Sequence, residues 1–424
     1  MVKLLLILFF FTNFVLSILY PWIGVCLGHF FNILGPQFIW WWNFEGIRPF
    51  LLISIPVIIG FFFGIIRRTL NFEVIKNKYV FFAVLYFLFV ILSYWLGPYV
   101  HVVNRWRFFD SYKVMNDMIK IFVFFFIALC CISDEKKMKF FSLALAIAVL
   151  YLIYWANMQY LTKPYVIRLR GPTNFHGSGI YNDQNVFSMV FVTGIPFLFY
   201  LGLYYKKWLI RSLCWLAIPF GWHAIFLTGS RGGLLGVVIT IIFTSIRLQR
   251  KMWGLIVILS FIIAYMWQGG SVLKERAKTI MAYKKESSAE ARIQSWKAGL
   301  RMIKAHPFTG VGIASYGQAF PDYSDKEPCV AHNTVIQITA ESGLPAGLCY
   351  LFFMLGYIRE LLKCRRSFSE GSFCFFMSDA VLVSMVGFLV CSLFLTLNLF
   401  EIQFYLIVLA NSIIYLSRRT SDML

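Results

Sequence analysis

Charged residues are scarce in this 424-residue chain, and acidic residues are the scarcest. Only 14% of the residues are charged, with 19 Asp and Glu against 39 Lys and Arg, while 60% are hydrophobic. Soluble domains carry about 25% charged residues, so the composition excludes an ordinary soluble fold. Uninterrupted apolar runs satisfy the backbone inside a bilayer as helices, and we therefore expect an all-α polytopic membrane protein.

Several motifs of well-known chemistry are also missing. The chain has no Walker A loop, no G-x-G-x-x-G after a strand and no H-E-x-x-H pair. Its nine cysteines show no paired spacing, which argues against a disulfide framework or a cysteine-type zinc site. We expect no use of ATP, no cofactor and no metal ion.

Long hydrophobic runs are what the chain has in quantity, and about 20 apolar residues suffice to cross a bilayer. The sequence predicts about 12 spans in a single integral membrane domain, 1-424, with a large loop inserted at 268-333. The predicted spans are 4-34 (tilted or bent around Pro21), 48-66, 78-97, 115-133, 139-158, 184-204, 208-227, 231-247, 251-267, 334-357, 373-396 and 399-417.

Basic residues mark every second connection, as short cytoplasmic loops do. We therefore expect a multi-pass membrane protein with both termini in the cytoplasm and the loop 268-333 on the outer side of the membrane. We reject a double crossing within 4-34, on the argument that it would place the basic loops on the outer side. We also expect no signal-peptide cleavage site in this segment. The basic connections contain Arg67 and Arg68; Lys136, Lys137 and Lys139; Lys206, Lys207 and Arg211; Arg247, Arg250 and Lys251; Lys363, Arg365 and Arg366; and Arg418 and Arg419.

The remaining positive charge falls on the other side of the membrane. A solvated or lipid-binding face is one explanation for it, and an anionic ligand is the other. These residues are Lys163, Arg168, Arg170, Lys274, Arg276, Lys278, Lys284, Lys285, Arg292, Lys297, Arg301, Lys304 and Lys326.

The large loop contains a predicted helix that begins at a capping Ser287 and ends before Pro307. Arg292 lies near its start, where the helix dipole favours an anion. One face of this helix is apolar and the opposite face basic, which is typical of an interfacial helix. The apolar face consists of Ile293, Trp296, Leu300 and Ile303, and the basic face of Lys297, Arg301 and Lys304.

Other polar residues lie where predicted spans begin on the outer side. Arg231 opens a span within LTGSRGGLLG, where Thr228 and Ser230 are candidate caps and Gly229, Gly232 and Gly233 are expected to leave room for a headgroup. His332 and Asn333 open a later span, with Glu341 roughly 13 Å further along that helix. Asp183 and Asn185 open another, and helix capping is the structural alternative for them.

Two permanent cations and one titratable base at helix ends suit transfer from a diphosphate-activated donor. Arg231 and Arg292 would hold phosphate oxygens and stabilise charge on the leaving group. His332, with an ordinary pKa near 6.5, would take a proton from an attacking hydroxyl. An arginine that reaches lipid phosphates and a hydrogen-bonded structural histidine are the alternatives.

Three segments resemble the O-antigen ligase and polymerase superfamily of multi-span glycosyltransferases: TGSRGG, RIQSWKAGLRMIKAHPFTGVG and AHNTVIQITAESGLPAG. YPWIGVCLGHFFNILGPQFIWW and GPTNFHGSGIYNDQN further resemble the branch described as O-glycosylation ligases of exopolysaccharide gene clusters. In that branch Asn commonly follows the outer aspartate, whereas Gln184 follows Asp183 here.

The resemblance implies a metal-independent, inverting transfer of a glycan from undecaprenyl diphosphate on the periplasmic side. It assigns the catalytic roles to Arg231, Arg292 and His332. Candidate contacts to the diphosphate or glycan are Arg168, Arg170, Arg301, Asp183, Asn185, Asn333 and Glu341.

The acceptor stays open at this level. Lipid A core would make the protein a ligase, another lipid-linked repeat a polymerase, and a protein side chain an O-oligosaccharyltransferase. The expected partners are these substrates and membrane lipids, with a chain-length regulator or a flippase as candidate protein partners and no nucleic acid. A polysaccharide or lipid transporter, or an inert scaffold, remains the alternative of another class.

Overall fold

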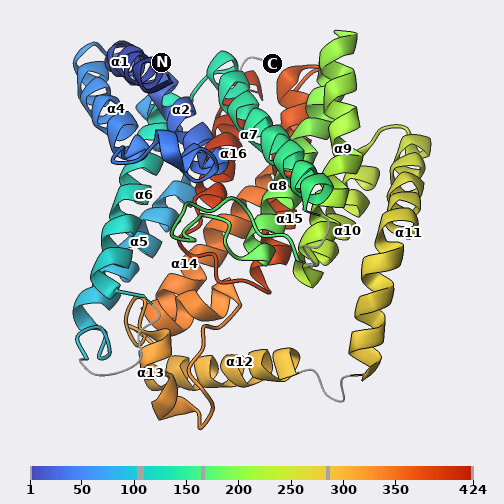
Figure 1. Ribbon diagram of the computed structural model, residues 1–424. Coiled ribbons are helices and arrows are strands. Elements are labelled where there is room, and N and C mark those ends of the chain that lie inside the picture. Colours follow the sequence, from blue (N-terminus) through green and yellow to red (C-terminus); the bar gives the residue numbers. More distant parts are fainter. Residues whose placement is uncertain (1, 103–108, 164–167, 283–286, 422–424) are drawn as a thin grey trace.

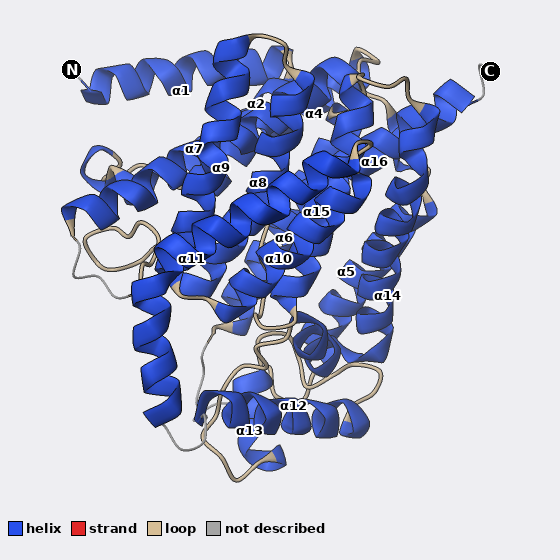
Figure 2. Cartoon of the chain, turned by 90° about the vertical axis from the view of Figure 1, so that its right-hand side faces the viewer, coloured by secondary structure: helices blue, strands red, loops and turns tan. Residues whose placement is uncertain are grey.

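The computed structural model describes residues 2–102, 109–163, 168–282 and 287–421, with side chains described outside 269–289 and 421. This described part is helical and contains no β-strand, as Figure 2 shows. Eleven of its helices are long and apolar enough to cross a membrane. The expectation of an all-α polytopic membrane protein is confirmed.

The long helices form one bundle whose members run from one end of the molecule toward the other (Figure 1). Two of them, α10 with 17 residues and the more polar α16, are not among the eleven but pack against the same bundle. The bundle consists of α1 (Val2–Leu19), α2 (Pro21–Leu34), α4 (Pro49–Ile66), α5 (Lys78–Leu96), α6 (Ser111–Cys131), α7 (Glu135–Thr162), α8 (Gln184–Tyr204), α9 (Trp208–Thr228), α10 (Arg231–Arg247), α11 (Lys251–Ala282), α14 (Thr334–Cys364), α15 (Phe373–Ser392) and α16 (Ile402–Ser421).

In the described part of the chain, five short helices and the 19-residue α12 lie in the connections between these elements. They are α3 (Pro36–Ile39), η1 (Trp41–Asn43), η2 (Phe72–Ile75), α12 (Ser287–Ala305), α13 (Tyr316–Tyr323) and η3 (Arg365–Ser367).

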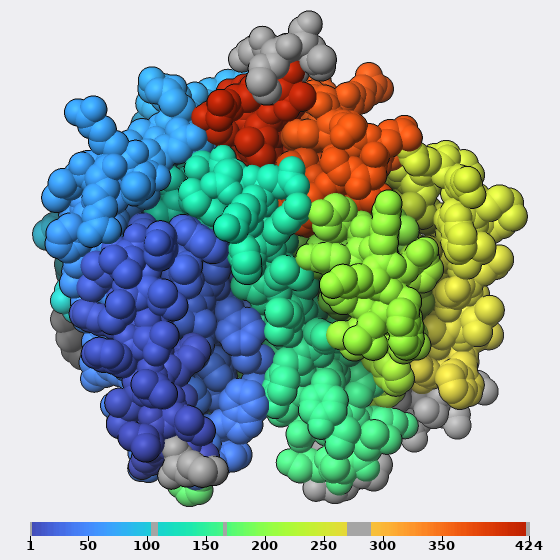
Figure 3. Space-filling view, turned by 90° about the horizontal axis from the view of Figure 1, so that it is seen from above, coloured from blue at the N-terminus to red at the C-terminus, as the bar shows by residue number. Residues whose placement is uncertain are grey.

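Helices α8 and α15 form the centre of the bundle. In the most apolar stretch of each helix, 89% of the residues of α8 and 78% of those of α15 are buried, whereas only 17% are buried in α1 and in α11. The Ser384 hydroxyl of α15 donates to the Thr193 carbonyl of α8 at 2.7 Å, so the two central helices are joined by a polar contact. The space-filling view shows residues of α1 and α11 at opposite margins of the molecule (Figure 3). The exposed apolar faces of these two helices therefore suit contact with lipid.

The expectation of a single span over 4-34 is wrong. Helix α1 ends at Leu19 and α2 starts at Pro21 because Tyr20, placed before a proline, adopts a non-helical φ of −136° and ψ of 80°. The two helices are antiparallel: Phe9 stacks on Phe31 with ring centroids 5.9 Å apart, while Ser17 lies against Gly24.

This hairpin changes the location of the N-terminal end. Val2 lines a groove together with Leu34 and Pro36, at the end where α2 finishes. The hydroxyl of Tyr181, which lies two residues before the Asp183 cap of α8, donates to the Ile33 carbonyl there at 2.5 Å. The start of α1 and the end of α16 thus lie at opposite ends of the bundle, as the labels N and C show in Figure 2. The reasoning from charge failed because an additional first crossing moves only the N-terminal end; each later loop keeps its side.

The basic ends of the helices gather at the end that holds the C-terminus. Asp379 of α15 is buried between two arginines, with Arg247 Nε at 2.6 Å from Oδ1 and Arg365 Nη1 at 2.9 Å from Oδ2. Lys139, at the start of α7, lies over the rings of Tyr204 and Phe373. The alternation of basic connections therefore corresponds to one physical face of the bundle.

The opposite end carries the connection between α11 and α14. Helix α11 continues to Ala282, beyond the predicted end at 267, and α12 then runs across the end of the bundle (Figure 1). Helix α14 is interrupted at Gly343, whose φ of 86° only glycine adopts readily, and the freed Leu344 N–H donates to the Pro307 carbonyl at 2.7 Å. The segment after α12 is thereby fixed against the break in α14.

The sides of α12 differ from the simple division that the sequence predicts. Ser295, Ala298 and Met302 form the buried side of α12, whereas Ile293 and Leu300 are about half exposed. Small residues face the protein because α12 lies close to α13 and α14. The capping role of Ser287 and the placement of Lys274, Arg276, Lys278, Lys284 and Lys285 lie outside the described side chains.

Candidate functional site

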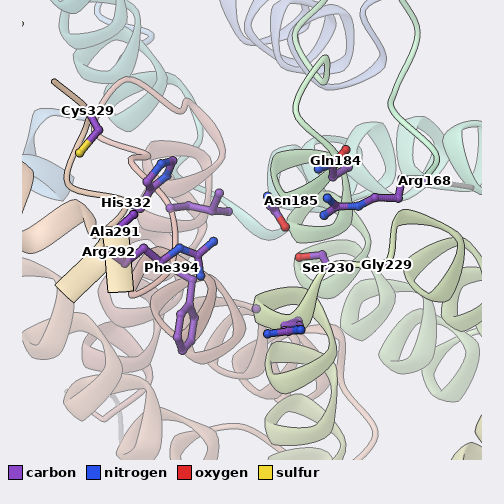
Figure 4. A pocket seen from close by; sticks show the side chains of 13 residues that line it. Arg168, Gln184, Asn185, Gly229, Ser230, Ala291, Arg292, Cys329, His332 and Phe394 are labelled. Atoms are coloured by element: carbon purple, nitrogen blue, oxygen red, sulfur yellow. The ribbon is translucent and has the colours of Figure 1, made fainter. Parts of the chain in front are cut away.

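A cavity of about 480 Å³ lies between the start of α12 and the starts of α8, α10 and α14. Figure 4 shows Arg292 and His332 on one side of it and Arg168, Gln184 and Asn185 on the other. The three catalytic candidates, separated by up to 101 positions in the sequence, all line this cavity. Its full lining is Arg168, Gln184, Asn185, Gly229, Ser230, Arg231, Gly232, Ala291, Arg292, Cys329, His332, Phe394 and Leu395.

Arg231 is placed by the turn between α9 and α10. Gly229 ends α9 in the left-handed conformation with a φ of 59°, and Ser230 caps α10 by accepting from the Gly233 N–H at 3.1 Å. Arg231 is the first residue of α10, where the helix dipole favours an anion. The predicted cap at Ser230 is confirmed, whereas Thr228 accepts from the Ser230 N–H and does not cap α10.

The glycines beside Arg231 differ in their roles. A Cβ on Gly233 would lie 1.8 Å from the Ser188 Oγ, so this glycine allows α10 to approach α8 and does not make room for a headgroup. Gly232 lines the cavity, and a Cβ there would lie 3.1 Å from the Cβ of Phe394. The expectation for Gly233 is wrong because close helix packing occupies the space beside it.

Arg292 projects from the second turn of α12 into the cavity. The next turn of α12 binds the segment that precedes α14. Trp296 Nε1 donates to the Ala331 carbonyl at 2.9 Å, and the Ser295 hydroxyl donates to the Val330 carbonyl at 3.0 Å. These bonds hold the residues before α14 against α12. Arg292 and His332 therefore reach the same cavity from different elements.

His332 has an unusual backbone conformation for a residue with a side chain. Its φ is 48°, and the following Asn333 caps α14 by accepting from the Ile336 N–H at 3.1 Å. The Asn333 amide also donates to the Leu393 carbonyl at 3.4 Å, and the Thr334 hydroxyl donates to the Leu395 carbonyl at 2.8 Å. Left-handed conformations of non-glycine residues concentrate at functional sites, and this one is held by hydrogen bonds of the Ala331 backbone before it and by the Asn333 cap after it.

The charges around His332 favour its neutral form. Burial lowers the pKa of His332 below 6.5, the cation of Arg292 lowers it further, and Asp183 partly opposes both by raising it. A histidine that is neutral at physiological pH is ready to accept a proton. The cavity therefore combines a base with cations that suit a phosphate group.

Arg168 adds a third cation on the far side of the cavity. With its amide oxygen turned toward Arg168, Gln184 accepts from Nη2 at 2.9 Å and from Nη1 at 3.0 Å. Partial burial lowers the pKa of Arg168, Asp183 raises it, and the nearby cations Arg170 and Arg231 lower it again. An anion in the cavity would relieve this repulsion.

Asp183 and Asn185 have different roles in the structure. The Asp183 carboxylate caps α8 by accepting from the N–H groups of Asn185 at 2.6 Å and Val186 at 3.2 Å. Asn185 itself lines the cavity. The structural alternative of capping is confirmed for Asp183, which nevertheless remains close enough to act on the charge of His332.

Four other candidate contacts do not line the cavity. Arg170 lies beside Arg168, Asn333 is engaged as the cap of α14, and Arg301 Nη1 donates to the Tyr323 carbonyl at 2.7 Å. Glu341 is buried and accepts from Gln337 Nε2 at 2.7 Å and from the Tyr316 N–H at 3.3 Å. Arg301 and Glu341 thus have protein partners where we expected substrate contacts, because α13 and its flanking loop fold back onto α12 and α14.

Sequence reasoning missed several lining residues. Gln184 carried a signal, since it departs from the asparagine common at that place, but its pairing with Arg168 required the fold. Phe394 and Leu395 lie inside the predicted span 373-396 and carried no signal. They reach the cavity because α15 ends at Ser392 and the chain then turns over the start of α14.

Comparison with known families identifies the segment that contributes eight of the thirteen residues lining this cavity. Residues 215–351 match the O-antigen ligase family, and the match contains Arg231, Arg292 and His332. This segment of the chain is similar to the O-antigen ligase domain. No curated protein matches the chain.

The O-antigen ligase domain confirms the resemblance to the ligase and polymerase superfamily. It indicates an integral membrane glycosyltransferase of the O-antigen ligase or polymerase type, which acts on a lipid-linked glycan and an acceptor. Within the described residues, no group of three or more His, Cys, Asp or Glu side chains converges as a metal site would require.

Proposed function

We propose that the protein transfers an oligosaccharide or polysaccharide from an undecaprenyl diphosphate carrier to an acceptor hydroxyl, on the periplasmic face of the bacterial inner membrane. The single observation that carries this proposal is the cavity that joins Arg168, Arg231 and Arg292 to His332. Three guanidinium groups match a diphosphate, and one neutral imidazole matches the proton of a hydroxyl. The reaction belongs to surface-polysaccharide biosynthesis, as ligation or polymerisation.

The chemistry is a single displacement at the anomeric carbon. The acceptor oxygen attacks the carbon, its proton passes to a ring nitrogen of His332, and the bond from the carbon to the phosphate oxygen breaks. Arg231 and Arg292 stabilise the negative charge that the departing diphosphate gains. A single in-line attack inverts the anomeric configuration, and the arginines supply the positive charge without a metal ion.

The product distinguishes transfer from transport. Purified protein given an undecaprenyl diphosphate-linked glycan and acceptor should release free undecaprenyl diphosphate and form a larger glycan. A transporter or flippase would move the lipid across vesicles and leave the diphosphate linkage intact, which would refute the proposal. Lipid and sugar analysis of a deletion strain then separates lipid A core, a lipid-linked repeat and a protein side chain as acceptors.

The hairpin of α1 and α2 gives a prediction about topology. With the basic end of the bundle in the cytoplasm, the start of α1 is periplasmic and the end of α16 is cytoplasmic. In intact spheroplasts, protease should remove an epitope tag placed before Val2 and spare a tag placed after Ser421 until the cells are lysed. Protection of both tags in spheroplasts would contradict this topology.

A further inference from the structure

A second, smaller cavity of about 120 Å³ lies beside the cationic cavity at the same end of the bundle. The same two stretches of chain line both cavities: 180–185 before and at the start of α8, and 394–402 between α15 and α16. The smaller cavity is lined by Asn32, Ile33, Ile180, Tyr181, Leu399, Phe400, Glu401, Ile402 and Tyr405. The two cavities are therefore built from neighbouring residues of the same two connections.

The polar groups of this cavity form a short chain. The Tyr405 hydroxyl donates to Glu401 Oε2 at 2.6 Å and accepts from Asn32 Nδ2 at 2.5 Å. This leaves Glu401 Oε1 and Asn32 Oδ1 without a protein partner among the described residues, and neither atom is sealed from solvent. The cavity thus offers two acceptor atoms, one on a carboxyl group and one on an amide.

Packing does not explain why a carboxylate is present here. The internal contact of Glu401 is a hydrogen bond from Tyr405, and a glutamine oxygen would accept it equally well. The neighbouring His29 is fully buried with its ring 3.9 Å from that of Tyr405, and Asp117 is close enough to repel a negative charge on Glu401. An ionisable group in a membrane protein is costly and by default has a function.

The shape and charge of the cavity restrict its ligand. A phosphate is repelled by Glu401, and Ca²⁺ or Mg²⁺ requires more oxygen ligands than one carboxylate and one amide supply. Hydroxyl donors suit both free acceptors, and hydrogen bonds to a carboxylate are the strong ones. Phe400, Ile180 and Leu399 provide apolar walls for the C–H faces of a ring.

We propose that this cavity binds one sugar residue of the glycan substrate, through hydroxyl groups that donate to Glu401 and Asn32. The proposal rests on the proposed glycan transfer, since it assigns a sugar subsite next to the diphosphate. The sugar belongs either to the donor chain or to the acceptor chain, which share this chemistry.

Glu401→Gln tests the subsite because it removes the charge and keeps the Tyr405 hydrogen bond. Glu360→Gln is the matched control, since Glu360 also accepts from a tyrosine, Tyr79 at 3.0 Å, at the opposite end of the bundle. Loss of a charge-assisted hydrogen bond should raise one KM by about ten- to a hundredfold in Glu401→Gln alone. A higher KM for the lipid-linked donor assigns the site to the donor chain, and a higher KM for the acceptor assigns it to the acceptor chain.

Direct binding separates this proposal from failure of the proposed function. The probe is the repeat-unit oligosaccharide released by mild acid from the host's lipid-linked intermediates, without carrier or diphosphate. Wild-type protein and Glu360→Gln in detergent should bind it, and Glu401→Gln should bind it at least tenfold more weakly at unchanged thermal stability. No binding by the wild type, equal binding by all three proteins, or equal losses in both variants would overturn the subsite.

Discussion

Replacing Arg292 by alanine should reduce glycan transfer by about a hundred- to a thousandfold and leave the protein in the membrane. Removal of one preorganised group that stabilises developing charge costs an enzyme about this much. Arg292 lies on α12, outside the bundle core, and shows no hydrogen bond among the described residues, so its loss should not unfold the protein. Transfer from the lipid-linked donor, measured by release of undecaprenyl diphosphate, is the readout.

Arg292→Lys and Lys304→Ala sharpen the interpretation of this result. Lysine keeps the charge and loses the planar fork that holds two phosphate oxygens, so Arg292→Lys should retain only part of the activity. Lys304 is an exposed cation of the same helix, and Lys304→Ala removes one charge without touching the cavity. Equal activity of Arg292→Ala and Lys304→Ala would show that α12 contributes only general positive charge.

Replacing His332 by alanine should lower kcat/KM by about a hundred- to ten-thousandfold, as expected for loss of a general base. The sign of the pH dependence follows from its surroundings. Burial and Arg292 lower the pKa of His332, so the base stays neutral and active below pH 6.5, and activity is lost only as the pH falls through the lowered pKa. The measurement is kcat/KM against pH for the wild type and the variant.

Asp183→Asn tests the origin of the loss of activity at low pH, which is the acidic limb of the pH profile. Asparagine is a good N-cap, so α8 should keep its start while His332 loses the negative charge that raises its pKa. The acidic limb should then move to lower pH, and it should be absent from the residual activity of His332→Ala. An identical acidic limb in the wild type and in His332→Ala would refute the role of His332 as the base.

The sequence by itself determined the class of the protein and most of its spans. Apolar runs have one stable solution in a bilayer, and local signals set their ends: α10 begins at Arg231 and ends at Arg247 as predicted, because Ser230 is a strong cap. The motifs also pointed to Arg231, Arg292 and His332, which the structure brings to one cavity.

The α1–α2 hairpin shows where a signal was present and was misread. Pro21 marked the bend, but a bend and a complete reversal have the same local sequence. Only contacts between the two helices, such as Phe9 on Phe31, distinguish them. The side of the N-terminal end followed from that packing and could not be obtained from the charges of later loops.

The tertiary structure alone decided which polar residues are available to a substrate. Asp183, Asn333 and Glu341 looked like site residues, yet their side chains accept from backbone N–H groups at the starts of α8, α14 and α13. Phe394 and Glu401 come to the two cavities through the loop between α15 and α16. Where a helix begins and ends depends on residues close in the sequence. Which group a polar side chain contacts depends on the distant segment that packs beside it, and only the packing of the whole chain determines that segment.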